Sequence, residues 1–128
     1  MKKNINVGKK ILVVEDDKDF ASILKTKFTT EGFVVVTAGD GQEGLEVAER
    51  EKPDLIITDV LMPIMDGIEM AKKIREANKN VLILILTNIQ DVDYTKNIEK
   101  SVEFDYLIKS ELRINDIVGK VKVKLGIK

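Results

Sequence analysis

The stretch PDLIITDVLMPIMDG, residues 53–67, contains a short apolar run that ends in an aspartate. The apolar run at 55–57 predicts a strand buried on both faces, and Asp59 follows at its carboxyl end. In open α/β sheets, ligands bind outside that end of the strands, where the strand order reverses. A single aspartate at a strand end is more often only a loop cap, so Asp59 needs partner residues before it indicates chemistry.

Further apolar runs on both sides of this stretch predict four more strands, with a helix after each strand. The strands are expected at 11–14, 33–37, 81–86 and 105–108. The first helix is expected at about 18–30, with Asp17 as its cap and Gly32 as its end, and the second begins after Gly39-Asp40-Gly41. The third helix is expected from its cap Asp66 to about Asn78, and the fourth at about 91–100. The last helix carries the apolar residues Ile114, Ile117, Val118, Val121 and Leu125. Right-handed crossovers then predict an α/β fold, a doubly wound, flavodoxin-like (βα)5 three-layer sandwich whose parallel strands have the order 2-1-3-4-5.

Length and composition limit the possible functions. The 128 residues, 44% of them hydrophobic, suit one domain, predicted at 10–128 after a flexible N-terminal tail at 1–9. The absence of cysteine and histidine excludes disulfides, thiolate chemistry and imidazole bases or ligands. A formal charge of -1 argues against direct nucleic-acid binding. No apolar run suits a signal peptide or a membrane span, so a cytoplasmic protein without membrane contact is expected.

Polar side chains end four of the five predicted strands. They are Glu15 and Asp16 after the first strand, Asp59 after the third, Thr87 after the fourth and Lys109 after the fifth. Because the carboxyl ends of parallel strands lie along one rim of the sheet, we expect these side chains to converge there. Each residue alone has an ordinary explanation, but a chance convergence of all four strand ends is much less expected.

The electrostatics of these residues favour a bound cation and a phosphoryl group. Two carboxylates about 5 Å apart repel by roughly 3 kcal/mol at an effective dielectric constant near 20, so the three acids together favour a cation. Mg²⁺ prefers such oxygen ligands and keeps positions for water or phosphate oxygens. Lys109 adds a second positive charge and Thr87 a hydroxyl group. Asp59 is the candidate nucleophile, because a carboxylate can form an acyl phosphate.

From about Lys10 to Leu125, the chain resembles the receiver domains of bacterial two-component response regulators. The resemblance rests on Ile-Leu-Val-Val-Glu-Asp-Asp at 11–17, Asp59 with Met62-Pro63 and Asp66-Gly67, Thr87, Tyr106 and Lys109, in this order and spacing. It implies that Asp59 accepts a phosphoryl group from a histidine kinase or a histidine phosphotransfer protein in a Mg²⁺-dependent reaction. Such a protein is a phosphoacceptor switch that assists its own phosphorylation and dephosphorylation.

The resemblance also implies which residues bind the metal and which set the lifetime of the signal. Mg²⁺ would be held by Asp16, Asp59 and the backbone carbonyl of Leu61, with Glu15 acting through water. The residues that could orient a hydrolytic water lie two positions beyond Asp59 and two beyond Thr87, and here they are Leu61 and Ile89. Because both side chains are bulky and apolar, slow loss of the phosphoryl group is expected.

The remaining implied roles concern the switch. Thr87, Asn88 and Lys109 would contact the phosphoryl group, and Thr87 and Tyr106 would move on phosphorylation. This movement is expected to remodel the face formed by the fourth helix, the fifth strand and the last helix, which would bind a downstream protein target.

Three residues depart from the usual receiver pattern. Ser110 stands where most receivers have a proline, often a cis one, so an ordinary trans peptide after Lys109 becomes possible. Val102 replaces a glycine that usually begins a turn, and a β-branched residue resists the left-handed conformation. Asn88 stands where a small residue is usual. None of these changes removes a chemical group that the switch needs.

Two other functions remain to be separated from this one. An aspartate-nucleophile phosphohydrolase would use the same Mg²⁺ and an aspartyl phosphate to turn over external phosphate esters. Such enzymes generally place a second acid two residues after the nucleophile, where this chain has Leu61, and no substrate cap is encoded. A receiver-like binding module that works without phosphorylation is disfavoured by the intact acids, threonine and lysine.

Overall fold

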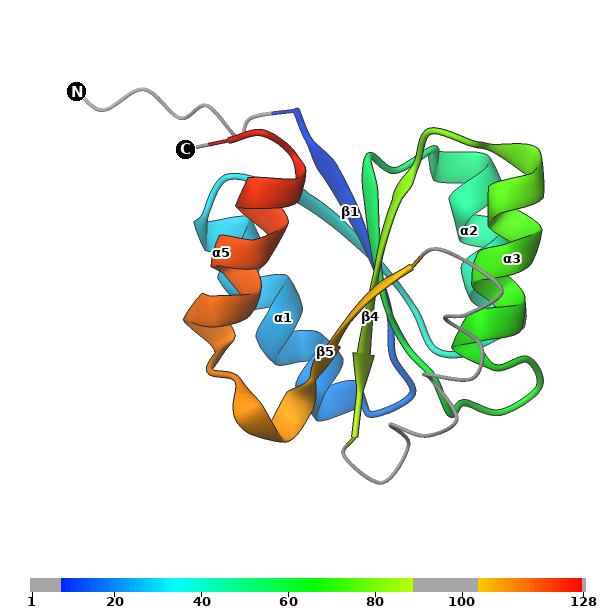
Figure 1. Ribbon diagram of the computed structural model, residues 1–128, viewed down its shortest axis with the longest axis horizontal. Coiled ribbons are helices and arrows are strands. Elements are labelled where there is room, and N and C mark those ends of the chain that lie inside the picture. Colours follow the sequence, from blue (N-terminus) through cyan, green and yellow to red (C-terminus); the bar gives the residue numbers. More distant parts are fainter. Residues whose placement is uncertain (1–7, 89–103, 128) are drawn as a thin grey trace.

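The computed structural model describes residues 8–88 and 104–127 of the chain, in which five strands form one parallel sheet of order β2-β1-β3-β4-β5. The strands are β1 (Lys10–Val14), β2 (Val34–Ala38), β3 (Leu55–Asp59), β4 (Leu82–Thr87) and β5 (Asp105–Ile108). The helices are α1 (Lys18–Thr30), α2 (Gly41–Glu51), α3 (Gly67–Ala77), the short 3₁₀ helix η2 (Lys109–Glu111) and α5 (Ile114–Lys124). Helices α1 and α5 cover one face of the sheet and α2 and α3 the other, which confirms the predicted three-layer, flavodoxin-like fold (Figure 1).

Two predicted strands begin one residue later than expected. The N–H of Phe33 donates to the carbonyl oxygen of Phe28 at 3.0 Å, so Phe33 closes the end of α1, where Gly32 has a left-handed φ of 98°. The carbonyl oxygen of Val81 accepts from Arg75 at 2.6 Å just before β4 begins. The predicted helix at 91–100 lies outside the described residues, and the division into a tail and a domain stays a prediction.

Two apolar layers pack the helices against the sheet. Because side chains alternate along a strand, each central strand contributes to both layers. The layer beneath α2 and α3 includes Leu12, Val14, Ile56, Ile83 and Ile85, and the layer beneath α1 and α5 includes Ile11, Val13, Leu55, Ile57, Leu84 and Leu86. All residues of β3 are buried, as predicted for a strand covered on both faces. The central strand therefore carries Asp59 to the rim of the sheet on a rigid support.

Gly67, the first residue of α3, lies directly against the end of β3. Its N–H donates to the carbonyl oxygen of Val60 at 2.7 Å, and the preceding Asp66 caps the helix by accepting from the N–H of Glu69 at 2.8 Å. A Cβ atom on Gly67 would lie 1.8 Å from the carbonyl oxygen of Asp59. Only glycine therefore allows α3 to begin this close to the strand that carries Asp59.

We expect Gly67→Ala to lower the free energy of unfolding by about 1–3 kcal/mol, because the added methyl group must push the helix away from the backbone of Asp59. Gly119→Ala is the matched control, since Gly119 lies within α5 and nothing is within 4 Å of a Cβ there. Helix propensity predicts that this control stabilises the fold by up to about 1 kcal/mol. Urea unfolding of both variants measures the difference, and equal stabilities would contradict the close-approach argument.

Candidate functional site

The site lies at the carboxyl ends of β1 and β3, the two neighbouring strands between which the strand order of the sheet reverses. Strand β1 pairs with β2 on one side and with β3 on the other. The chain continues from β1 into α1 on one face of the sheet and from β3 towards α3 on the other (Figure 1). A crevice therefore opens outside these two strand ends, the usual ligand position in a doubly wound sheet.

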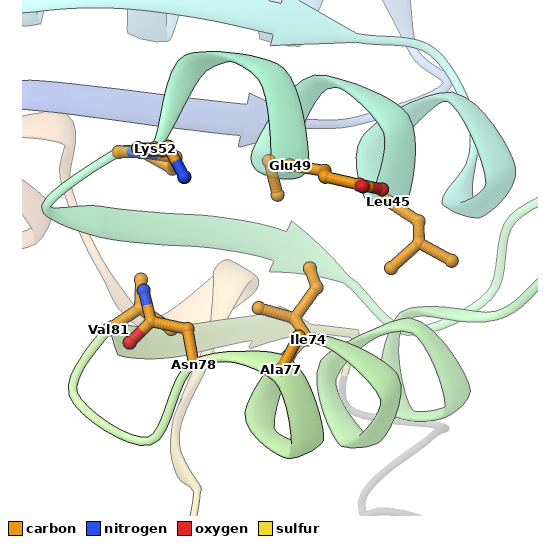
Figure 2. A pocket seen from close by; sticks show the side chains of 9 residues that line it. Leu45, Glu49, Lys52, Ile74, Ala77, Asn78 and Val81 are labelled. Atoms are coloured by element: carbon orange, nitrogen blue, oxygen red, sulfur yellow. The ribbon is translucent and has the colours of Figure 1, made fainter.

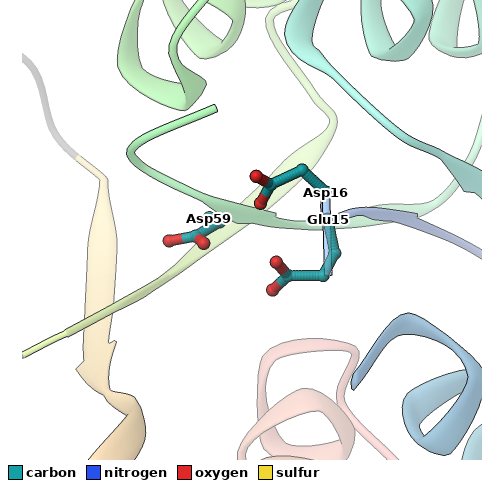
Figure 3. Close-up of side chains that lie close together, drawn as sticks. All are labelled: Glu15, Asp16 and Asp59. Atoms are coloured by element: carbon teal, nitrogen blue, oxygen red, sulfur yellow. The ribbon is translucent and has the colours of Figure 1, made fainter. Parts of the chain in front are cut away.

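Three carboxylates meet at this crevice and form the carboxylate cluster, Glu15, Asp16 and Asp59. One carboxylate oxygen from each residue lies within 4.8 Å of the others (Figure 3). Glu15 is 4% exposed and Asp59 is 7% exposed, whereas Asp16 is exposed. Because buried like charges destabilise one another, the cluster needs positive charge from the protein or from a bound cation.

Backbone hydrogen bonds hold the two buried carboxylates in place. Oδ1 of Asp59 accepts from the N–H of Val60 at 2.7 Å. Oε2 of Glu15 accepts from the N–H of Asp17 at 3.1 Å, and the Asp17 side chain in turn caps α1 through the N–H groups of Asp19 and Phe20. The first turn of α1 and the end of β3 thus fix the positions of both carboxylates.

Lys109 supplies the positive charge from the end of β5. Its Nζ donates to Oε1 of Glu15 at 2.7 Å and to Oδ2 of Asp59 at 3.1 Å. The same Nζ lies 4.7 Å from the ring centre of Phe20, a contact that the sequence analysis missed. The only sequence signal for Phe20 was its helical spacing, which indicates a core position and not a place in the site.

The pKa values of Glu15 and Lys109 are both raised. Burial raises the pKa of the Glu15 carboxyl above 4.5, although the hydrogen bond from Lys109 opposes this effect. Burial lowers the pKa of Lys109, but its hydrogen bond to Glu15 and the charge of Asp59 outweigh burial. Because the pKa of Glu15 is higher in the folded protein than in the unfolded chain, its contribution to stability is fully present below its unfolded pKa and is lost as the pH rises through its raised pKa. Lys109 stabilises the fold below its unfolded pKa, and that contribution is lost as the pH rises through its folded pKa.

An open cleft of about 540 Å³ surrounds the carboxylate cluster. It is lined by Glu15, Asp16, Asp17, Phe20, Asp59, Leu61, Asn88, Lys109 and Ser110. The side chain of Leu61 is 56% exposed at this cleft, and Asn88 is also exposed there. No peptide bond in the described residues is cis, so the bond between Lys109 and Ser110 is trans.

Two predicted switch residues, Thr87 and Tyr106, do not line the cleft. Thr87 is fully buried, and its Oγ1 donates to the carbonyl oxygen of Asn88 at 3.3 Å. Tyr106 is half-buried and packs against the apolar layer beneath α2 and α3. Ile89 lies outside the described residues. The structure thus brings Glu15, Asp16, Asp59 and Lys109 together, with Leu61 and Asn88 at the cleft.

A second cavity of about 250 Å³ lies at the opposite end of the sheet, between the carboxyl ends of α2 and α3 (Figure 2). Its lining is mainly apolar and includes the buried residues Ala48, Ile74 and Val81, with Glu49 and Lys52 as its charged residues. One carboxylate and one lysine do not reproduce the chemistry of the carboxylate cluster. The candidate site is therefore the cleft around Asp59.

The chain matches the family model of the response regulator receiver domain over residues 11–122. It is 40% identical over 114 residues to the alkaline phosphatase synthesis transcriptional regulatory protein PhoP of Bacillus subtilis, covering 89% of this chain and 43% of that protein. It is 33% identical over 99 residues to the transcriptional regulatory protein AfsQ1 of Streptomyces coelicolor, covering 77% of this chain and 44% of that protein. The chain thus spans less than half the length of these curated relatives.

Solved structures give the same assignment. The response regulator TrrA of Thermotoga maritima, in complex with Mg²⁺ and BeF, is similar with a TM-score of 0.78 and 31% identity, covering 89% of this chain and 96% of that chain. The receiver domain of a Francisella response regulator has a TM-score of 0.80 and 34% identity, covering 91% and 95% of the two chains.

The relatives leave two expectations open. Both curated relatives are named as transcriptional regulators and are longer than this chain, so the expected absence of nucleic-acid contact stays a prediction for this domain alone. Within residues 8–88 and 104–127, no helix is both long and apolar enough to cross a membrane. The cytoplasmic location also stays a prediction.

Proposed function

The chain belongs to the family of response regulator receiver domains, and from this premise we propose that it is a phosphorylatable switch with Asp59 as the phosphoacceptor. The observation that carries the proposal is the position of the Asp59 carboxylate. One oxygen is fixed by the N–H of Val60, and the other lies 3.1 Å from the ammonium group of Lys109 in an open cleft. A nucleophile held in this way can receive a phosphoryl group from a phosphohistidine on a partner protein.

The transfer exchanges one bond to phosphorus for another. A carboxylate oxygen of Asp59 attacks the phosphorus, and the new P–O bond forms as the P–N bond to the imidazole of the donor breaks. The imidazole nitrogen keeps the electron pair of that bond and takes up a proton. The donor is a histidine kinase or a histidine phosphotransfer protein, since this chain has no histidine of its own.

The carboxylate cluster fits Mg²⁺ by its chemistry. Its donors are hard carboxylate oxygens within 4.8 Å of one another, and one of the three residues is exposed to entering ions. Asp16, Asp59 and the backbone carbonyl of Leu61 would hold the ion, and Glu15 would contact it through water. When bound, Mg²⁺ neutralises negative charge on the phosphoryl oxygens.

The switch follows from the change of charge at Asp59. The arriving phosphoryl group gives Lys109 and the Thr87 hydroxyl a new acceptor, and Thr87 would leave its bond to the Asn88 carbonyl. Tyr106 would move with Thr87, because the two residues lie on the paired strands β5 and β4. The resulting change at the face that includes β5 and α5 would be recognised by a downstream protein.

Phosphorylation by a small donor tests the proposal. Incubation with Mg²⁺ and acetyl phosphate is expected to add one phosphoryl group, seen by intact-mass measurement, and EDTA is expected to prevent the addition. Hydroxylamine should remove the group, because it cleaves acyl phosphates. An unchanged mass, or a phosphoryl group that survives hydroxylamine, would contradict the proposal.

The rival phosphohydrolase function is disfavoured by Leu61. Its side chain lies at the cleft in the position where such enzymes generally carry an acid, so no group there can protonate a leaving alcohol. A panel of phosphate esters separates the two functions, because the switch is expected to turn over none of them.

The lifetime of the aspartyl phosphate is predicted to depend on Leu61. Its exposed apolar side chain at the cleft can shield the phosphorus but cannot orient a water, so Leu61→Asn should speed phosphoryl loss by about threefold to tenfold. This increase is smaller than that from a general base, because the amide of asparagine can orient the water but cannot take its proton. Ile64→Asn is the control, because Ile64 is an exposed apolar residue of the same loop that does not line the cleft. Decay of the phosphorylated mass over time measures both rates. Equal decay in wild type and Leu61→Asn would refute the shielding role, and Ile89→Glu would then test the second predicted position.

A further inference from the structure

Phe20 is an aromatic residue of the cleft that belongs to none of the chemical groups described so far. It lies in the first turn of α1, four residues after Asp16, and the half-buried residue also packs against the apolar layer beneath α1 and α5. Its ring centre lies 4.7 Å from Nζ of Lys109, which comes from the far end of the chain. Phe20 is therefore held by the apolar layer beneath α1 and α5, and its ring contacts Lys109 in the cleft.

The contact has the geometry of a cation–π interaction. An ammonium group within about 6 Å of a ring centre is attracted by the negative face of the ring, and the attraction is stronger where water is partly excluded. The side chain of Lys109 is only 17% exposed. The ammonium group thus contacts Glu15, Asp59 and the ring of Phe20, which come from the ends of three different elements.

We infer that Phe20 is a positioning residue that keeps the Lys109 ammonium group beside Asp59. A lysine side chain is a flexible four-carbon stem, so without the ring the ammonium group can spend more time near Glu15 or in solvent. Phosphoryl transfer depends mainly on the position of charged groups around the phosphorus. The inference rests on the proposed function, because it assigns Phe20 a role in the same transfer.

The contribution of the ring can be separated from simple packing. A leucine at position 20 still fills apolar space against the layer beneath α1 and α5, but it lacks the negative ring face. Tyrosine keeps that face. If Phe20 acts through Lys109, the effect of Phe20→Leu must disappear once Lys109→Met has removed the ammonium group. This double-mutant cycle isolates the interaction between the two side chains.

The experiment measures the rate of phosphorylation by acetyl phosphate and the affinity for beryllofluoride, a phosphoryl mimic, both with Mg²⁺. Phe20→Leu is expected to lower both by about threefold to tenfold, whereas Phe20→Tyr stays close to wild type. Mg²⁺ affinity without beryllofluoride is expected to change by less than about twofold. In the Lys109→Met background, Phe20→Leu should have no further effect. Phe33→Leu, at a buried aromatic position just before β2, is the control for loss of stability without loss of transfer.

The outcomes distinguish this inference from the proposed function. If wild type neither gains a phosphoryl group nor binds beryllofluoride, the proposed function fails and the role of Phe20 fails with it. If wild type does both and Phe20→Leu equals it, only the positioning role is overturned. A loss in Phe20→Leu that persists unchanged in the Lys109→Met background would also overturn it, because the ring would then act through packing alone.

Discussion

Asp59→Asn is expected to abolish phosphorylation by acetyl phosphate, with a loss of about a hundredfold or more. The amide keeps the shape of the side chain and can still accept from the N–H of Val60, but its oxygen carries no negative charge and does not attack phosphorus. The fold should survive, because the change removes one charge from a crowded acidic cluster while Lys109 keeps its bond to Glu15. Intact-mass measurement after incubation with Mg²⁺ and acetyl phosphate gives the result.

Asp66→Asn is the matched control for this variant. Asp66 lies in the same loop region and caps α3, and asparagine caps helices about as well as aspartate. Asp66 does not line the cleft, so the control should be phosphorylated like wild type. Labelling of Asp59→Asn to the wild-type extent would place the acceptor on another residue and remove the central assignment.

Asp16→Ala is expected to weaken Mg²⁺ binding by about tenfold to a hundredfold or more. Asp16 is the exposed member of the carboxylate cluster, and one of its oxygens lies within 4.8 Å of oxygens of Glu15 and Asp59. Loss even of a residue that only supports a metal ligand typically costs this much affinity, and Asp16 is proposed to bind the ion directly. Titration calorimetry with Mg²⁺ measures the affinity. Unfolding without metal should show equal or higher stability, because a like charge is gone.

The neighbouring Asp17 provides the control for Asp16. Asp17 also lines the cleft, but its side chain is used to cap α1 through the N–H groups of Asp19 and Phe20. Asp17→Asn keeps that cap and should change Mg²⁺ affinity by less than about threefold. Normal Mg²⁺ binding by Asp16→Ala would show that the ligand assignment is wrong, whereas equal losses in both variants would indicate a general effect of charge.

The local pattern of the chain determined the strands and helices that the structure describes, and their order. Apolar runs and helical spacing report burial along one segment at a time, and the caps Asp17 and Asp66 act on N–H groups two or three residues away. Such short-range features need no knowledge of the rest of the fold. The sequence could therefore also predict that Asp59 ends a central strand and that acids, a threonine and a lysine stand at the ends of three other strands.

Only the tertiary structure decided which of these side chains touch. Lys109 bonds Glu15 across 94 positions of sequence, a contact that depends on sheet order, strand twist and the path of η2. The same packing makes Gly67 indispensable beside Asp59. Phe20 has ordinary helical spacing, and its place beside the lysine arises because α1 and the end of β5 meet at one rim of the sheet. Contacts between distant segments depend on three-dimensional distances, which residue spacing along the chain does not encode.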